Sequence, residues 1–408
     1  MTSPSSAESA PVVTKPQPPS AGPMQVFRNR LLRGDLGQLP VVLTLILIAI
    51  FFEITSHGIF FAPQNLSNLI LQIVTIGFLA LGSVLVLLIA EIDLSLAAVS
   101  SLCGAVLVAL SANHGASATT AIIAAIVVGA VIGLVNGFFV AVMRVPSFIV
   151  TLAALIGYTG LLIHVLLPNA SIRLIDPVLT GIAANYLTFP WDVLLPVPLI
   201  ALYVLLQLWN RIQRQRAGLA QEPLWALGVR TGVVVVISVL ALIIFESYRG
   251  IPYSALILVC ALLLFWLIMR FTGFGRHVYA VGGNAEAARR AGIGVVGIRV
   301  VVFTLASTLA AIGGVLASSR AISASAQVNP TLLLDAIAAA VIGGVSLFGG
   351  RGSVWAVVLG SLIIGSLENG LDLLSQGTDV KLMVEGVVLL IAVTADAITR
   401  RRNATGLR

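Results

Sequence analysis

Long apolar segments alternate with short polar connections along most of the chain, from about residue 39 to residue 400. Several segments reach the roughly 20 residues that an α-helix needs to cross a bilayer. Long alternating strand patterns, which are typical of membrane β-barrels, do not occur. The pattern predicts an all-α polytopic membrane protein with about twelve transmembrane segments, within a range of about 10–12. The apolar segments are 39–61, 66–90, 94–112, 119–143, 147–167, 193–209, 229–246, 251–270, 299–320, 332–350, 353–372 and 382–399.

Two of the predicted turns are too short to join complete helices. Residues 91–93 join the second and third segments, and residues 349–352 join the tenth and eleventh. Two full helices can hardly reverse direction within three or four residues. Broken or re-entrant helices would solve this, and they are tolerated where the backbone lines a cavity or lies within protein. We therefore expect some of the segments to be broken or re-entrant.

The composition supports a membrane protein. Hydrophobic residues make up 59% of the chain and charged residues only 10%, compared with about 25% charged in soluble domains. This excludes a soluble enzyme, a DNA-binding protein and a disordered scaffold. With both termini in the cytoplasm, the outside receives only four of the 23 basic residues, as the positive-inside rule requires. Those four are Arg173, Arg249, Arg320 and Lys381.

The sequence divides the chain into three parts. Residues 1–38 are rich in Pro and Ser and are predicted to form a disordered cytoplasmic tail. Residues 39–400 form the transmembrane domain, which includes a long cytoplasmic loop at 271–298. Residues 401–408 are a basic cytoplasmic tail.

An acidic motif interrupts the apolar sequence at Glu91-Ile92-Asp93-Leu94-Ser95. An acid placed deep in a bilayer costs about 2.5–3.5 kcal/mol on insertion scales. The motif could form a gate or a polar pathway, or Asp93 could simply cap the next helix. In the C-terminal half, Glu368 and Asp372 are four residues apart and so share one helix face. The candidates for a pathway or gate are Glu91, Asp93, Ser95, Asn136, Ser147, Thr151, Asp335, Glu368 and Asn369.

The loop 271–298 contains a short predicted helix outside the membrane. Asn284 is a suitable N-cap, the residues up to Ala291 favour helix, and Gly292 would end it. The element could dock a partner, or it could be an ordinary solvated turn of helix.

The chain has none of the common catalytic or ligand-binding motifs. A P-loop needs Gly-Lys followed by Ser or Thr, and neither Lys15 nor Lys381 follows glycine. The four histidines are scattered, so they predict no metal site. The sequence therefore predicts no catalytic residues, no metal, no cofactor and no nucleic-acid partner.

Several of these segments resemble the permeases of ABC importers. Glu286-Ala287-Ala288 followed by Gly292 fits the short E-A-A-x-x-x-G element of that family. The overall pattern is similar to the ribose/xylose/arabinose branch over roughly residues 40 to 400. The middle section resembles the D-xylose permeases of this branch. The other matching segments are 91–95, 145–152, 282–284, 335–344, 211–219 and 248–252.

The resemblance implies a permease subunit in the bacterial cytoplasmic membrane that imports a monosaccharide, D-xylose first among the candidates, by alternating access. Its implied partners are a cytoplasmic ABC ATPase, an extracytoplasmic sugar-binding protein, a second copy of the chain and membrane lipid. Glu286, Ala287, Ala288 and Gly292 would lie on the coupling helix that meets the ATPase. In one departure from the family pattern, Ala97-Ala98 stands where a glycine-serine pair is common.

Three other functions remain open at this point. A stand-alone proton-coupled sugar transporter could use Glu91, Asp93 or Glu368 as proton carriers. A membrane enzyme could act on a lipid-linked sugar, although the chain offers no catalytic constellation. A structural or sensory membrane protein would move no solute.

Overall fold

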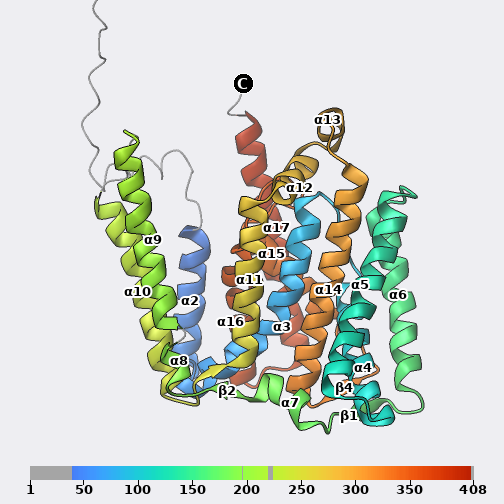
Figure 1. Ribbon diagram of the computed structural model, residues 1–408. Helices are drawn as coiled ribbons and strands as arrows, with labels where there is room; N and C mark the ends of the chain where they lie inside the picture. The colour runs from blue at the N-terminus through green and yellow to red at the C-terminus, as the bar shows by residue number, and fades with distance from the viewer. Residues whose placement is uncertain (1–38, 195, 219–223, 406–408) are drawn as a thin grey trace, which may run out of the picture. The chain divides into compact units, whose positions relative to one another are not determined.

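The computed structural model describes residues 39–194, 196–218 and 224–405, so the predicted tail 1–38 lies outside the described residues. Figure 1 shows helices side by side, with α13 at the upper end and β1 and β4 at the lower end. The helices are α2 (Leu39–Thr55), α3 (Pro63–Leu88), α4 (Leu96–His114), α5 (Ala118–Ala141), α6 (Ser147–Leu166), α7 (Pro177–Ala184), α8 (Trp191–Leu194), α9 (Pro196–Arg216), α10 (Leu224–Glu246), α11 (Tyr253–Phe271), α12 (Gly273–Gly283), α13 (Ala285–Arg290), α14 (Val295–Ala321), α15 (Pro330–Ile342), α16 (Ala356–Leu373) and α17 (Thr378–Thr405).

The predicted apolar segments correspond to helices. Each of them coincides with one of α2–α6, α9–α11 or α14–α17. In the described part of the chain, nine helices are long and apolar enough to cross a membrane, and α2 and α15 contain shorter apolar stretches. This confirms the all-α membrane fold. The number of spans and the cytoplasmic position of the termini stay predictions. Helix α17 continues to Thr405, into the predicted tail 401–408.

The two connections are longer than the apolar segments indicate, because the helices end earlier than the apolar sequence does, and the re-entrant helices stay a prediction. Helix α3 ends at Leu88 and α4 begins at Leu96, while α15 ends at Ile342 and α16 begins at Ala356. The connections are therefore residues 89–95 and 343–355. Apolar residues within the connections, Ile89, Val345 and Val354, are buried within the protein, where irregular structure is tolerated, while most other residues of the connections are partly or fully exposed.

Helix α14 is central to the packing and contacts α3, α4 and α5. Its approach to α5 is close: a β-carbon on Gly133 would meet the carbonyl oxygen of Phe303. Small residues permit such helix packing without a hydrophobic driving force. Ala97 and Ala98, which replace the expected glycine-serine pair, are buried in the first turn of α4. They form regular helix there, so the break lies before them.

At the opposite end of the helices from α13, the loop 168–192 joins helices that are far apart in the sequence (Figure 1). Strand β1 (Ser171–Arg173) pairs antiparallel with β4 (Ser323–Ser325), and β2 (Tyr186–Leu187) pairs with β3 (Ile251–Pro252). The Ser319 hydroxyl of α14 donates to the carbonyl of Leu179 in α7. The loop therefore ties the ends of α14 and α11 to the short helix α7 and its neighbours.

Candidate functional site

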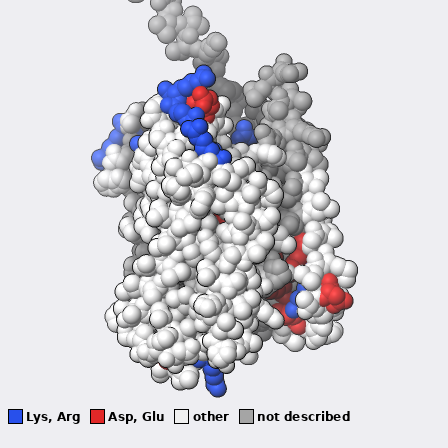
Figure 2. Space-filling view, turned by 90° about the vertical axis from the view of Figure 1, so that its right-hand side faces the viewer, with Lys and Arg blue, Asp and Glu red and all other residues white. Residues whose placement is uncertain are grey.

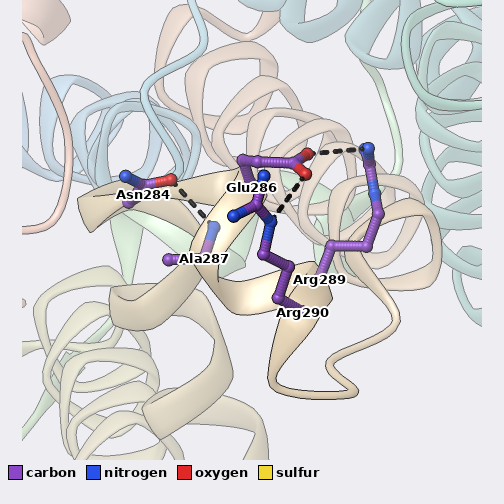
Figure 3. Close-up of polar contacts among 5 residues, drawn as sticks. All are labelled: Asn284, Glu286, Ala287, Arg289 and Arg290. Atoms are coloured by element: carbon purple, nitrogen blue, oxygen red, sulfur yellow. Dashed lines mark hydrogen bonds and ion pairs between the residues drawn. The ribbon is translucent and has the colours of Figure 1, made fainter.

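The short helix that the sequence predicts in the loop 271–298 is α13, which follows α12 directly. Asn284 ends α12 and caps α13, since its Oδ1 accepts from the backbone N–H of Ala287 at 2.9 Å (Figure 3). Gly292 has φ +85°. The N–H of Ile293 donates to the carbonyl of Ala288 at 3.0 Å, which satisfies an orphan carbonyl as helix-ending glycine motifs do. The predicted N-cap and helix end are both confirmed.

One side of α13 is charged and open. Glu286 pairs with Arg289 at 3.1 Å and with Arg290 at 3.2 Å, and all three side chains are mostly exposed (Figure 3). Exposed pairs of this kind add little stability. Ala287 is also exposed, whereas Ala288 is buried. Ala288 therefore anchors the helix, while Glu286 and Ala287 are available to a partner.

Helix α12 packs against the C-terminal end of α3 and the connection 343–355. A β-carbon on Gly282 would overlap the Leu88 carbonyl oxygen, which already accepts from the N–H of Gly350 at 3.0 Å. The Tyr279 hydroxyl donates to the carbonyl of Gly352 at 3.0 Å, and burial raises the pKa of Tyr279. A displacement of α12 would therefore act directly on the end of α3, where the connection 89–95 begins, and on the connection 343–355.

A chain of hydrogen bonds joins the acidic motif to two helices. Asp93 Oδ1 accepts from the Ser95 backbone N–H at 2.8 Å and from its hydroxyl at 2.6 Å. Asn136 donates to Ser95 Oγ at 3.1 Å, and the Tyr158 hydroxyl donates to Asn136 at 2.9 Å. Asp93 thus binds Ser95, which is itself the N-cap residue of α4, and does not cap that helix. The sequence analysis missed Tyr158, whose signal is a hydroxyl within an apolar segment.

Three other predicted residues hold the same motif in place. The Ile92 N–H donates to Ser147 Oγ at 3.3 Å, and Thr151 Oγ1 donates to the Ile92 carbonyl at 3.4 Å. Glu91 pairs with Arg299 at 2.9 Å, with side chains 13% and 27% exposed. The six candidates from the first half of the chain therefore converge on residues 91–95. Sequence reasoning counted Arg299 as a cytoplasmic charge and did not identify it as the partner of Glu91.

A cavity of about 220 Å³ lies beside Asp93, between this motif and α15. Its lining includes Ser83, Ile337 and Leu347. Asp93 Oδ2 and Ser83 Oγ have no hydrogen-bond partner within the described residues. Buried polar atoms without protein partners beside free space are suited to bind water or a small polar ligand.

The C-terminal candidates lie on another set of helices. Asp335 is buried on α15, and the carboxylates of Glu385 on α17 and Glu368 on α16 are close enough to interact with its charge, Glu385 the more strongly. Asp372 is exposed and pairs with Lys381. Asn369 is buried and exchanges amide hydrogen bonds with Asn65 of α3. Asn369 thus joins α16 to α3, while Asp335 and Glu368 contribute acidic groups from α15 and α16.

No metal site emerges from the described residues, where no group of three His, Cys, Asp or Glu side chains is placed to bind one. The polar groups around residues 91–95 and those on α15 and α16 are instead built from hydrogen bonds, carboxylates and two ion pairs, Glu91–Arg299 and Asp372–Lys381. These groups can orient hydroxyl-bearing or charged ligands, and they can hold helix ends in place.

The family model that matches the chain is described as a branched-chain amino acid transport system permease component and covers residues 65–393. The xylose transport system permease protein XylH of Haemophilus influenzae is 38% identical over 89% of this chain and 98% of its own length. XylH of Escherichia coli K12 is 36% identical over 89% of this chain and 92% of its own length.

Ribose permeases are also similar. The ribose import permease protein RbsC of Escherichia coli K12 is 32% identical over 88% of this chain and 94% of its own length. No solved structure gives a significant match.

Proposed function

Because this chain belongs to the family of branched-chain amino acid transport system permease components, within its ABC sugar permease branch for ribose and xylose, we propose that its substrate is D-xylose. The chain is a multi-pass protein of the cytoplasmic membrane and a transport subunit, not an enzyme. The family membership removes the membrane enzyme from the alternatives.

The similarity to XylH carries the proposal of D-xylose. The two XylH proteins are 38% and 36% identical to this chain, compared with 32% for RbsC. The match to Haemophilus influenzae XylH extends over 98% of that protein. A sugar-binding protein outside the membrane would deliver the sugar, and it would contribute to the choice between pentoses.

The α12–α13 segment is the proposed docking site of a cytoplasmic ATPase subunit. Glu286 and Ala287 face outward, Ala288 anchors the helix, and Gly292 ends it. The contacts of Gly282 with Leu88 and Gly350 support a mechanical link, because a rigid push on α12 reaches the end of α3 and the connection 343–355. ATP-driven closure of the ATPase pair would then shift the permease between its inward-facing and outward-facing populations.

The proposed route for sugar runs past the polar groups around residues 91–95 and those on α15 and α16, in an assembly that contains a second copy of this chain. Asp93, beside its cavity, and the acidic pair Asp335 and Glu368 are the proposed contacts or gates for sugar hydroxyls. The remaining candidates would position these groups. They are Glu91, Ser95, Asn136, Ser147, Thr151 and Asn369.

Uptake of labelled D-xylose into proteoliposomes tests the proposal. One sample holds this chain alone under a proton gradient, and the other adds its ATPase, its binding protein and ATP. Uptake in the complete, ATP-fed mixture only is the expected result. Uptake by the chain alone would favour the proton-coupled transporter. Uptake of ribose in preference to xylose would contradict the assignment of D-xylose as the substrate.

A charge reversal tests the docking site. Glu286→Arg removes both ion pairs of an exposed side chain and should change stability by no more than about 1 kcal/mol. We expect it to abolish ATP-driven uptake while the chain still assembles in the membrane. The matched control is Asp379→Arg, at an exposed acid of α17. Unchanged uptake and ATPase stimulation in Glu286→Arg would show that α13 is not the coupling helix.

A further inference from the structure

A second cavity, of about 210 Å³, lies where α5, α6 and α14 meet α13. Three arginines line it: Arg144 from the turn after α5, Arg289 from α13 and Arg299 from α14. One acid, Glu91, lines the same cavity. The cavity therefore brings together guanidinium groups from three separate parts of the chain.

The positive charge in this cavity exceeds what its neighbours neutralise. Glu91 pairs with Arg299 at 2.9 Å, yet the Arg299 Nε is buried without a hydrogen-bond partner in the described part of the chain. Arg289 pairs with Glu286, outside the cavity lining, at 3.1 Å. Arg144 has no ion pair with any acid among the residues that the structure describes. Guanidinium donors therefore remain available to an anion.

Two helix N-termini add to the positive electrostatic potential of the cavity. Ser147 begins α6, Val295 begins α14, and both residues line the cavity. The N-cap residue is Pro146 in α6 and Gly294 in α14, and within the described residues neither helix has a side chain that caps it. First-turn N–H groups of such helices lack intrahelical partners and carry partial positive charge. Together with the arginines, they suit a phosphate group.

The surroundings of the cavity are apolar and exposed. Val296 lines the cavity, and Met143 and Phe148 are next in the sequence to the lining residues Arg144 and Ser147. Their side chains are 43%, 56% and 52% exposed, respectively. Figure 2 shows basic side chains gathered at the upper end of this face, above a broad surface that is largely uncharged. A phosphate group bound in the cavity would thus have apolar protein surface beside it for attached acyl chains. Basic pockets between membrane helices bind anionic lipid headgroups in this way.

We propose that the cavity lined by Arg144, Arg289 and Arg299 binds the phosphate headgroup of an anionic phospholipid, with the acyl chains along the exposed apolar surface of α5 and α6. The lipid would contact α13 through Arg289 and the 91–95 motif through Glu91 and Arg299. Binding of the lipid in the cavity would therefore affect the position of α13 relative to the 91–95 motif.

Lipid binding to the full chain in phosphatidylcholine nanodiscs tests the site. Spin-labelled phosphatidylglycerol is titrated in, and the motionally restricted fraction is measured beside that of spin-labelled phosphatidylcholine. We expect preferential retention of phosphatidylglycerol, and a decrease of about five-fold in that preference for Arg144→Gln, given the usual contribution of one basic residue at a membrane surface. Arg144 is exposed, so this variant should fold.

The matched control is Arg270→Gln, at an exposed arginine of α11 that does not line the cavity. It should keep the preference for phosphatidylglycerol. Equal losses in Arg144→Gln and Arg270→Gln, or no loss in Arg144→Gln, would overturn the proposal. Inorganic phosphate is the competitor that separates lipid from free anion. Failure of millimolar phosphate to displace the labelled lipid supports a lipid site, and complete displacement would assign the cavity to a free anion instead.

Discussion

Asn65 and Asn369 exchange two amide hydrogen bonds, of 2.9 and 3.1 Å, across 304 residues of sequence. Asn65 also donates to the carbonyl of Phe60. Both side chains are buried, and they join α3 to α16. An amide pair of this kind satisfies polar groups that the surrounding apolar helices cannot.

Asn369→Ala should lower the free energy of unfolding by roughly 1–3 kcal/mol, because it leaves the Asn65 amide buried with fewer partners. Thermal unfolding of the purified chain in detergent measures the loss. The control is a double-mutant cycle with Asn65→Ala, in which the combined loss should be smaller than the sum of the single losses. Additive losses would mean that the two amides act independently.

Gly282→Ala should destabilise the packing of α12 against Leu88 and Gly350. The added β-carbon would overlap the Leu88 carbonyl oxygen and approach the backbone nitrogen of Gly350. Overpacking of this kind costs about 1–3 kcal/mol, and more where backbone must move. The neighbouring Gly283→Ala is the matched control, since a β-carbon there meets nothing within 4 Å. We expect a lower melting temperature for Gly282→Ala only, and equal melting temperatures would contradict the close contact.

Gly292→Ala should weaken the coupling between ATP hydrolysis and transport. Gly292 has φ +85°, and an alanine in the left-handed region costs roughly 1–2 kcal/mol. The end of α13 would shift or fray, although a β-carbon there meets no neighbouring atom. ATPase stimulation by the sugar-loaded binding protein is the measurement. Gly294→Ala, at φ −72°, is the control that should retain stimulation, and a similar loss in both variants would point to a general effect on the loop.

Glu91→Gln should reduce ATP-driven uptake by loosening the 91–95 motif, because it removes the 2.9 Å pair with Arg299. A double-mutant cycle on stability with Arg299→Gln should give a coupling energy of about 1–2 kcal/mol. Without its partners, the chain should show no gradient-driven uptake, whether it carries glutamate or glutamine at this position. Gradient-driven uptake that disappears in Glu91→Gln would instead identify Glu91 as a proton carrier.

Local chemistry allowed much of the architecture to be predicted from the sequence. The length and spacing of the apolar segments predicted where the membrane helices lie, since a helix needs about 20 apolar residues to cross a bilayer. Asn284 and Gly292 marked the two ends of α13 for a similar reason, because capping is decided within one helical turn. The family resemblance rested on the same short segments, and the comparisons confirmed it.

The polar partners and the helix breaks depended on tertiary structure. Apolar residues such as Ile89 and Val345 follow the helix ends at Leu88 and Ile342, and they are buried in non-helical connections that only the tertiary structure defines. Asp93 does not occupy the N-cap position of α4 that the sequence analysis considered for it, because Ser95 does. Asn65 and Asn369 meet only after α3 and α16 pack, and Glu91 meets Arg299 only after α14 enters the bundle. Hydrophobicity determines that a segment leaves water for lipid or for the protein interior, whereas long-range packing decides which polar groups meet inside the protein.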